Sequence, residues 1–210
     1  DRGAYALGRY APYIREENNF DMFCVVNFYR PLTTTPEEAA EIINSAKRPF
    51  IYFGGGVITA DAENEVLALA EKIDAPIGCS LMGLSAIPTD HPRFLGMQGM
   101  HGHYASSMSM HNADVILSLG VRFNDRVTGN RTKFAKEAKI VHIDVDGSEL
   151  NKTVNSVCGL RGDVKLTLQK LLPLLNESAK PDWMTKVNAF RKEEESYLDN
   201  REGLTPRRAI

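Results

Sequence analysis

The sequence has no long apolar run, no strong excess of either charge and few cysteines. None of its hydrophobic stretches approaches the roughly 18–20 residues that span a bilayer, and its first residues, DRGAYALGRY, lack the apolar core of a secretory signal. With 25 basic and 27 acidic residues the net charge is −2, so no basic field draws the chain to nucleic acid or to an anionic membrane. We therefore expect a cytoplasmic globular protein that binds neither.

The three cysteines, Cys24, Cys79 and Cys158, are far apart and form no C-x-x-C pattern. Cys79 and Cys158 lie in apolar, strand-like stretches, where a buried reduced thiol behaves as a small hydrophobe. Cysteine usage therefore agrees with a cytoplasmic protein.

Several catalytic patterns are also missing. The usual dinucleotide fingerprint, G-x-G-x-x-G, does not occur, and neither does G-x-S-x-G or a nucleophile–histidine arrangement that spacing singles out. His101, His103 and His111 form no helical i,i+4 pair and have no cysteine partner, so we predict no metal site. Spacing alone assigns no residue a catalytic role.

From Pro36 onward the sequence alternates between helical and strand-like segments. Thr35-Pro36-Glu37-Glu38 predicts a helix start, with a capping hydroxyl, proline in the first turn and acids at the positive end of the helix dipole. The alternation predicts a doubly wound α/β fold, with a mostly parallel sheet of about six strands and helices on both faces. The predicted strands are 49–53, 76–80, 114–120, 139–146 and 156–162, and the predicted helices are 36–48, 62–73, 103–112, 163–175 and 184–198.

Three parts are expected along the chain. Residues 1–35 show no clear period of two or 3.6 and form a lead-in of uncertain structure. Residues 36–175 form the α/β domain, and residues 176–210 form a charged helix and the start of a linker to a missing domain. The abrupt ending, with a new element begun at Leu204, favours a piece of a longer protein.

Small or polar residues follow five of the predicted strands. Ligands of open α/β sheets bind beyond the carboxyl ends of the strands, where turns and helix starts offer N–H groups. Together the five turns predict a dinucleotide groove, although each one alone is weak evidence, since a triple glycine is about as often a plain turn. The turns are Gly54–Gly56, Ser80–Gly83, Gly120–Arg122, Asp144–Asp146 and Gly162–Val164.

Two further segments favour a nucleotide ligand. GMQGMHG (96–102) combines glycines that permit close backbone approach with methionines that supply polarizable surface for a flat ring, although the methionines could simply fill a core gap. RFNDR (122–126) places two guanidiniums beyond a strand end, where they suit a pyrophosphate or carboxylate. A surface ion pair with Asp125 is the alternative.

The chain resembles the central domain of acetolactate synthase (acetohydroxyacid synthase), large catalytic subunit. The resemblance rests on RPFIYFGGGVI, SLMGLSAIPTDHPRFLGMQGMHG, DVILSLGVRFNDRVTG, HIDVDGSEL and GDVK, which occur in order between about residues 36 and 175. It implies a Rossmann-like domain that binds FAD without a net redox role. The whole enzyme would bind thiamine diphosphate and Mg²⁺ in domains absent from this chain, and would condense pyruvate with a second 2-oxo acid in branched-chain amino-acid synthesis.

The resemblance also implies partners and site residues. The partners would be FAD, the 2-oxo acid substrates, other domains and subunits of a homo-oligomer, and a regulatory subunit. Met100 and Arg126 would face the substrate, with Arg126 holding the carboxylate of the second 2-oxo acid. The FAD contacts implied by position are Gly54, Gly55, Gly56, Ser80, Leu81, Met82, Met100, His101, Gly120, Arg122, Asn124, Arg126, Asp144 and Asp163.

One departure and two alternatives accompany this interpretation. The family usually has F-D-D-R where this chain has Phe123-Asn124, so one charge near the flavin is missing. The catalytic glutamate and the G-D-G metal motif belong to the absent domains, so we expect this chain to be inactive alone. The alternatives are the equivalent domain of another thiamine-diphosphate enzyme, such as a pyruvate oxidase or decarboxylase, and a free-standing nucleotide-binding module.

Overall fold

The computed structural model describes residues 34–131 and 133–199, and the structural statements below concern these residues. They belong to one unit that begins at Thr34. Almost all of the predicted lead-in lies outside the described residues, as do Cys24 and the predicted linker after residue 199.

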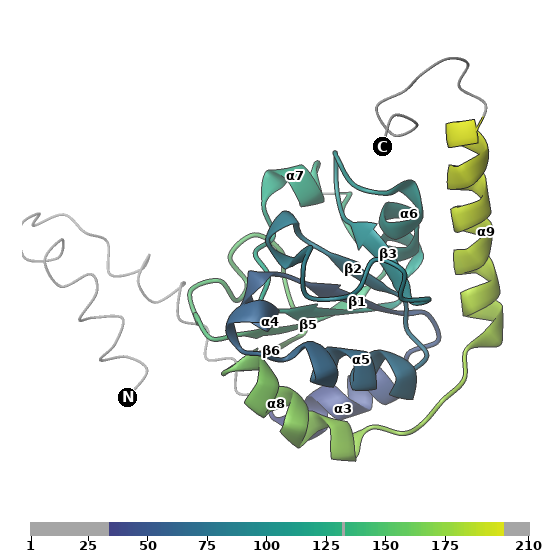
Figure 1. Cartoon of the computed structure of the whole chain (residues 1–210). Helices are drawn as coiled ribbons and strands as arrows, with labels where there is room; N and C mark the ends of the chain where they lie inside the picture. The colour runs from purple at the N-terminus through teal and green to yellow at the C-terminus, as the bar shows by residue number, and fades with distance from the viewer. Residues whose placement is uncertain (1–33, 132, 200–210) are drawn as a thin grey trace, which may run out of the picture. The chain divides into compact units, whose positions relative to one another are not determined.

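Six parallel strands form one sheet in the order β3-β2-β1-β4-β5-β6. The chain builds from β1 toward one edge and then returns to the other side of β1, so the order reverses between β1 and β4. Helices cover both faces of the sheet (Figure 1), and the predicted doubly wound α/β fold is confirmed. The strands are β1 (Pro49–Phe53), β2 (Ile77–Cys79), β3 (Phe94–Met97), β4 (Val115–Leu119), β5 (Lys139–Asp144) and β6 (Cys158–Arg161).

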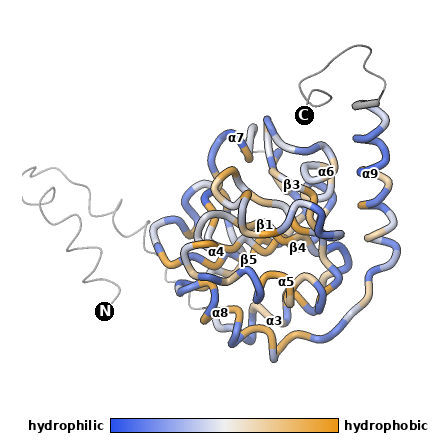
Figure 2. Tube along the Cα trace, in the orientation of Figure 1, coloured by the Kyte–Doolittle hydropathy of each residue, from blue (hydrophilic) through white to orange (hydrophobic). Residues whose placement is uncertain are grey.

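The sheet separates two apolar layers. Residues of β1 alternate between them: Ile51 and Phe53 join one layer, whereas Phe50 and Tyr52 join the other. Every residue of β1 and β4 is buried, as expected for central strands covered on both faces. Figure 2 shows these strands as hydrophobic. The first layer is covered by α3 (Pro36–Asn44), α5 (Glu63–Lys72) and α8 (Val164–Leu171), and the second by α6 (Tyr104–Asn112) and α9 (Pro181–Asp199).

Helix α3 shows how local sequence specifies an element. The Glu38 N–H donates to Thr35 Oγ1 at 3.3 Å, and Glu38 Oε2 accepts from the Thr35 N–H at 2.9 Å, which completes a capping box. Pro36 occupies the first turn, where its missing N–H is not needed. Ala39 and Ile43 face the core, so the predicted helix start and its apolar face are confirmed.

Several short elements were not predicted. Residues 94–97 form the edge strand β3, whose last two residues, Gly96 and Met97, belong to the segment interpreted as a ligand-binding turn. Residues 54–56, interpreted as a turn, lead directly into the short helix α4 (Gly55–Thr59). A second short helix, α7 (Asp125–Thr128), follows β4.

The last two helices differ from the prediction mainly at one end each. The predicted helix 163–175 ends as α8 at Leu171 and continues as the 3₁₀ turn η2 (Leu172–Leu174), because Pro173 has no N–H for the α-helical ladder. The C-terminal helix α9 begins at Pro181, three residues before the predicted start, since proline fits the first helical turn.

Two sequence-based expectations concern burial and membranes. Cys79 and Cys158 are free and buried, as predicted. Within the described ranges, no helix combines the length and the apolar character needed to cross a membrane.

Candidate functional site

All six strands end at one edge of the sheet because they are parallel. We call the turns that follow them the carboxyl edge: residues 54–56, 80–82, 97–102, 120–126, 144–146 and 162–163. The strand order reverses between β1 and β4, in the middle of this edge, and open α/β sheets bind their ligands at such a point. Every predicted cofactor residue lies on the carboxyl edge.

The glycines after β1 allow two turns to approach very closely. The Gly54 N–H donates to Leu119 O at 3.1 Å, and the Gly56 N–H donates to Gly120 O at 3.0 Å. A Cβ built on Gly56 would lie 2.6 Å from the Gly120 Cα, and one on Gly54 would lie 2.6 Å from Gly120 O. These glycines are therefore required by packing across the switch point, and two of their N–H groups are already used by the chain.

Large apolar side chains are exposed on both sides of the switch point. Leu81, Met82 and Met100 are 68 %, 73 % and 66 % exposed in the turns after β2 and β3. Val145 is 68 % exposed in the turn after β5, on the other side. A folded protein rarely leaves several such groups close together in water without a partner, so Leu81, Met82 and Met100 favour a ligand with a flat apolar part, to which Val145 would add one apolar contact.

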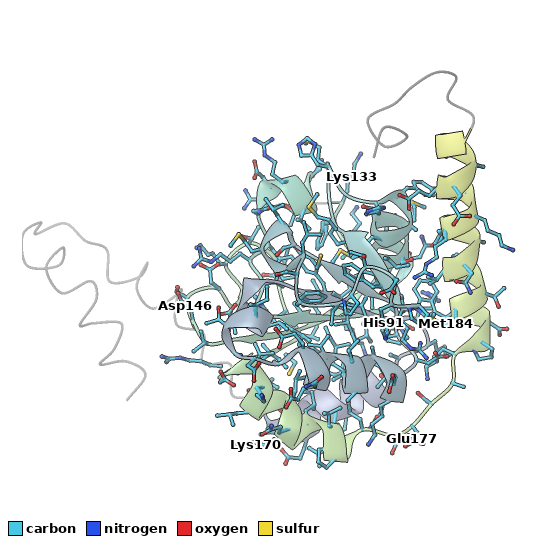
Figure 3. The ribbon with its side chains drawn as sticks, viewed as in Figure 1. His91, Lys133, Asp146, Lys170, Glu177 and Met184 are labelled. Carbon is cyan, nitrogen blue, oxygen red and sulfur yellow. The ribbon has the colours of Figure 1, made fainter. Side chains whose placement is uncertain are left out.

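A carboxylate lies at the end of β5, directly before Val145. Asp144 is mostly buried, and its Oδ1 accepts from the Asp146 N–H at 2.8 Å. Burial raises the pKa of Asp144 above its ordinary value, and that backbone hydrogen bond partly opposes the rise. Figure 3 shows Asp146, two residues further on, at the outer end of this turn. The carboxylate is thus partly desolvated and suited to accept from ligand hydroxyl groups.

His142 supports this edge from inside the sheet. Because a carbonyl can only accept, Nε2 of His142 carries the proton and donates to Val121 O at 3.1 Å. Nδ1 has no hydrogen-bond partner among the described residues. Burial lowers the pKa of His142 to about 4, so the ring is neutral near pH 7 and its 4.0 Å approach to Asp144 is not an ion pair.

The turn after β4 holds both candidate arginines. The Arg122 side chain is 76 % exposed, and its Nε lies 3.5 Å from the largely buried Glu149 carboxylate. Asn124 caps α7, since its Oδ1 accepts from the Val127 N–H at 3.2 Å. Asparagine and aspartate cap helices about equally well, so the departure from F-D-D-R preserves this structural role. Arg126 is exposed in α7.

The methionine-rich segment lies beside that turn. The Met100 N–H donates to Arg126 O at 2.9 Å, so the two predicted substrate-facing residues are brought together although 26 positions separate them. Gly99, with φ of +96°, packs so closely on the Arg126 carbonyl that no side chain would fit. The Gln98 side chain is buried and donates to Ser106 O at 2.8 Å, which fixes the base of the segment.

The remaining predicted residues are placed as follows. Asp163 caps α8, where its Oδ1 accepts from the Leu166 N–H at 3.0 Å, so its side chain has a structural role at this position. The Ser80 N–H donates to Phe53 O at 2.8 Å and joins the turns after β1 and β2. His101 is exposed on the carboxyl edge.

Sequence reasoning missed two supporting residues. Glu149 pairs with Arg122. The sequence marks Glu149 only as an acidic residue in a turn that follows a strand. Val145 was not assigned a role because it lies between two aspartates, and its exposure is visible only in the structure. The described residues contain no cluster of histidine, cysteine or acidic side chains that could hold a metal ion.

Comparison with known proteins decides the family. The family described as thiamine pyrophosphate enzyme, central domain, matches residues 36–171, which cover all six strands and α8. The chain belongs to this family. Helix α9 lies beyond the matched residues.

The central domain is similar to the acetolactate synthase large subunits of several organisms. It is 40 % identical over 174 residues to the isozyme 3 large subunit of Escherichia coli, and the alignment covers 78 % of this chain and 30 % of that protein. It is 38 % identical over 197 residues to the large subunit of Buchnera aphidicola subsp. Schlechtendalia chinensis, covering 88 % of this chain and 34 % of that protein. It is 42 % identical over 159 residues to a probable large subunit of Methanocaldococcus jannaschii, covering 74 % of this chain and 27 % of that protein. The chain thus spans about a third of the length of these relatives.

Proposed function

We propose that the chain is the central domain of an acetolactate synthase and binds FAD along the carboxyl edge. The observation that carries this proposal is the exposed apolar patch of Leu81, Met82 and Met100 beside the switch point. FAD has a flat ring at each end of a pyrophosphate, and these three side chains suit the flavin ring. The exposed Val145 offers an apolar contact on the other side of the switch point.

Polar groups of the carboxyl edge suit the middle of the same ligand. The exposed guanidinium of Arg122 matches a pyrophosphate, and the Asp144 carboxylate matches ribose hydroxyl groups. We propose that FAD contacts the full set of predicted residues: Gly54, Gly55, Gly56, Ser80, Leu81, Met82, Met100, His101, Gly120, Arg122, Asn124, Arg126, Asp144 and Asp163. In this reaction FAD would supply no net electron transfer.

Further proposals concern the whole enzyme. Other domains would bind thiamine diphosphate and Mg²⁺, and this chain alone would be inactive. Met100 and Arg126 would line the site where pyruvate condenses with a second 2-oxo acid, because the hydrogen bond between their backbones presents both at one place. The Arg126 guanidinium would orient the carboxylate of that second substrate. We also propose homo-oligomeric subunits, a regulatory subunit and a cytoplasmic location.

Titration with FAD tests the binding proposal directly. We expect saturable quenching of flavin fluorescence by the 210-residue chain, with weaker binding of ADP, which has only one ring. The Met82→Asp variant places a charge in the apolar patch and should weaken FAD binding at least tenfold. The control, Val157→Asp, changes an apolar side chain that is 52 % exposed and directly precedes β6, at the opposite end of the strands from the carboxyl edge. Equal FAD affinity of both variants would contradict the proposed site.

The substrate role needs a complete acetolactate synthase that contains this domain. We expect Arg126→Ala to raise the KM for the second 2-oxo acid by about tenfold or more, because a carboxylate–guanidinium contact contributes about 1.5–3 kcal/mol. Unchanged steady-state kinetics would rule out that role for Arg126 and would not contradict the proposal that the chain binds FAD.

A further inference from the structure

A carboxylate from α9 completes the first turn of α6. The N-cap residue of α6 is His103, and its own side chain does not cap the helix. Instead, Glu194 Oε2 accepts from the Ala105 N–H at 3.1 Å, and Glu194 Oε1 accepts from Nδ1–H of His103 at 2.8 Å. A glutamate 91 residues away thus supplies the cap that the local sequence lacks.

His103 also fixes the end of the methionine-rich loop, residues 97–102. Its N–H donates to Met97 O at 2.8 Å. Its ring lies against the Cα of Gly96 so closely that a side chain there would collide with it. The ring position and the loop path are therefore coupled, and Glu194 holds the ring.

Helix α9 is well anchored at other points. The buried Trp183 donates from Nε1 to Pro49 O at 2.9 Å, and Arg191 Nη2 donates to Phe94 O at 2.9 Å, which satisfies a carbonyl of the edge strand β3. The Met184 sulfur lies 4.0 Å from Arg93 Nη1, beside the loop that leads into β3 (Figure 3). Glu194 therefore extends from a fixed support.

We propose that Glu194 is a positioning residue that holds loop 97–102, through His103, in the conformation that presents Met100 and His101 at the carboxyl edge. The loop contains Gly99 and Gly102, which increase its freedom, so a tether at its end has a large effect on it. The effect on the loop rests on the structure alone, and the effect on FAD rests on the proposed function.

Amide hydrogen exchange of the loop tests this role. The Met100 and Gly102 N–H groups donate to Arg126 O and Gly99 O at 2.9 Å each, so their exchange rates report loop opening. We expect Glu194→Ala to accelerate exchange at both amides and to weaken FAD binding, each by about five- to tenfold, which corresponds to loss of one or two hydrogen bonds. The control, Glu195→Ala, removes an exposed acid from the same helical turn and should leave both measurements unchanged.

A second variant separates positioning from simple helix capping. In the double variant His103→Ser/Glu194→Ala, the serine can cap α6 itself, whereas the link to α9 is absent. We expect its melting temperature to recover toward that of the original chain while loop exchange stays fast. Restored loop protection in the double variant, or unchanged exchange in Glu194→Ala, would overturn the proposal. If the original chain does not bind FAD, the proposed function fails, and the exchange rates still decide the role of Glu194.

Discussion

Replacing Gly56 by alanine tests the close approach at the switch point. The added Cβ would lie 2.6 Å from the Gly120 Cα and 2.8 Å from Gly120 O, against 3.4–4 Å for an ordinary contact. Both neighbours are backbone atoms, which cannot rotate away. Overpacking of this kind costs about 1–3 kcal/mol, and the two turns must separate.

Separation of the turns has a second cost. It weakens the hydrogen bonds from Gly54 to Leu119 and from Gly56 to Gly120, each of which contributes about 0.5–1.5 kcal/mol. Alanine gains about 1 kcal/mol over glycine inside a helix, and Gly56 lies in α4. We therefore expect Gly56→Ala to lower the free energy of unfolding by about 2–3 kcal/mol, as the balance of these terms.

Urea unfolding at pH 7.5 measures this loss, with Gly55→Ala as the matched control. A Cβ on Gly55 would meet the Met82 Cβ at 3.2 Å, and Met82 lies in a short exposed turn that can adjust. We expect a change below about 1 kcal/mol for the control, because helix propensity offsets the crowding. Equal losses in the two variants would refute the argument from the Gly120 contact.

Four further predictions concern titration, FAD binding and capping. Burial lowers the pKa of folded His142 to about 4, against 6.5 in the unfolded chain. The unfolded state therefore binds the proton first, and the free energy of unfolding falls below pH 6.5. We expect a loss of about 2 kcal/mol by pH 5, and a flatter pH profile of unfolding in His142→Gln. Burial raises the pKa of Asp144 above 3.8, so its ionised form is disfavoured in the folded chain. Asp144→Asn should therefore stabilise the chain at pH 7, and this gain in unfolding free energy should disappear below pH 3.8. Asp144→Ala should weaken FAD binding by about 1–3 kcal/mol in calorimetry, and equal affinities would contradict the ribose contact. Asn124→Ala should cost about 1 kcal/mol of stability through the lost cap of α7, whereas Asn124→Asp should be neutral in thermal unfolding.

The fold was largely predictable because its signals are local. The capping box at Thr35 and Glu38 marks a helix start within four residues, and the run 49–53 is apolar at every position, as a buried parallel strand requires. β3 escaped prediction because its Gly96 and Met97 were assigned to the glycine-rich ligand segment, and it is the pairing with β2 that makes residues 94–97 a strand.

The candidate site was predictable only in outline. The turns after the strands could be located from the sequence, since the carboxyl ends of parallel strands meet at one edge. The separate jobs of the residues could not be predicted: Asn124 and Asp163 cap helices, and Gly54 and Gly56 permit contact with another turn. The roles of the glycines depend on where a distant turn lies in space, whereas each cap joins residues three positions apart and competes with a ligand role that the sequence suggests equally well.

The sequence by itself determined the order of the longer helices and strands, the capping box of α3 and the glycine-rich or polar character of the turns. Those properties depend on residues within a few positions of each other, so local sequence carries them. Only the tertiary structure decided that Met100 meets Arg126, that Val145 and Met82 are both exposed, and that Glu194 caps α6. Such contacts join residues tens of positions apart, and strand order and helix docking bring them together without leaving any period or spacing in the sequence.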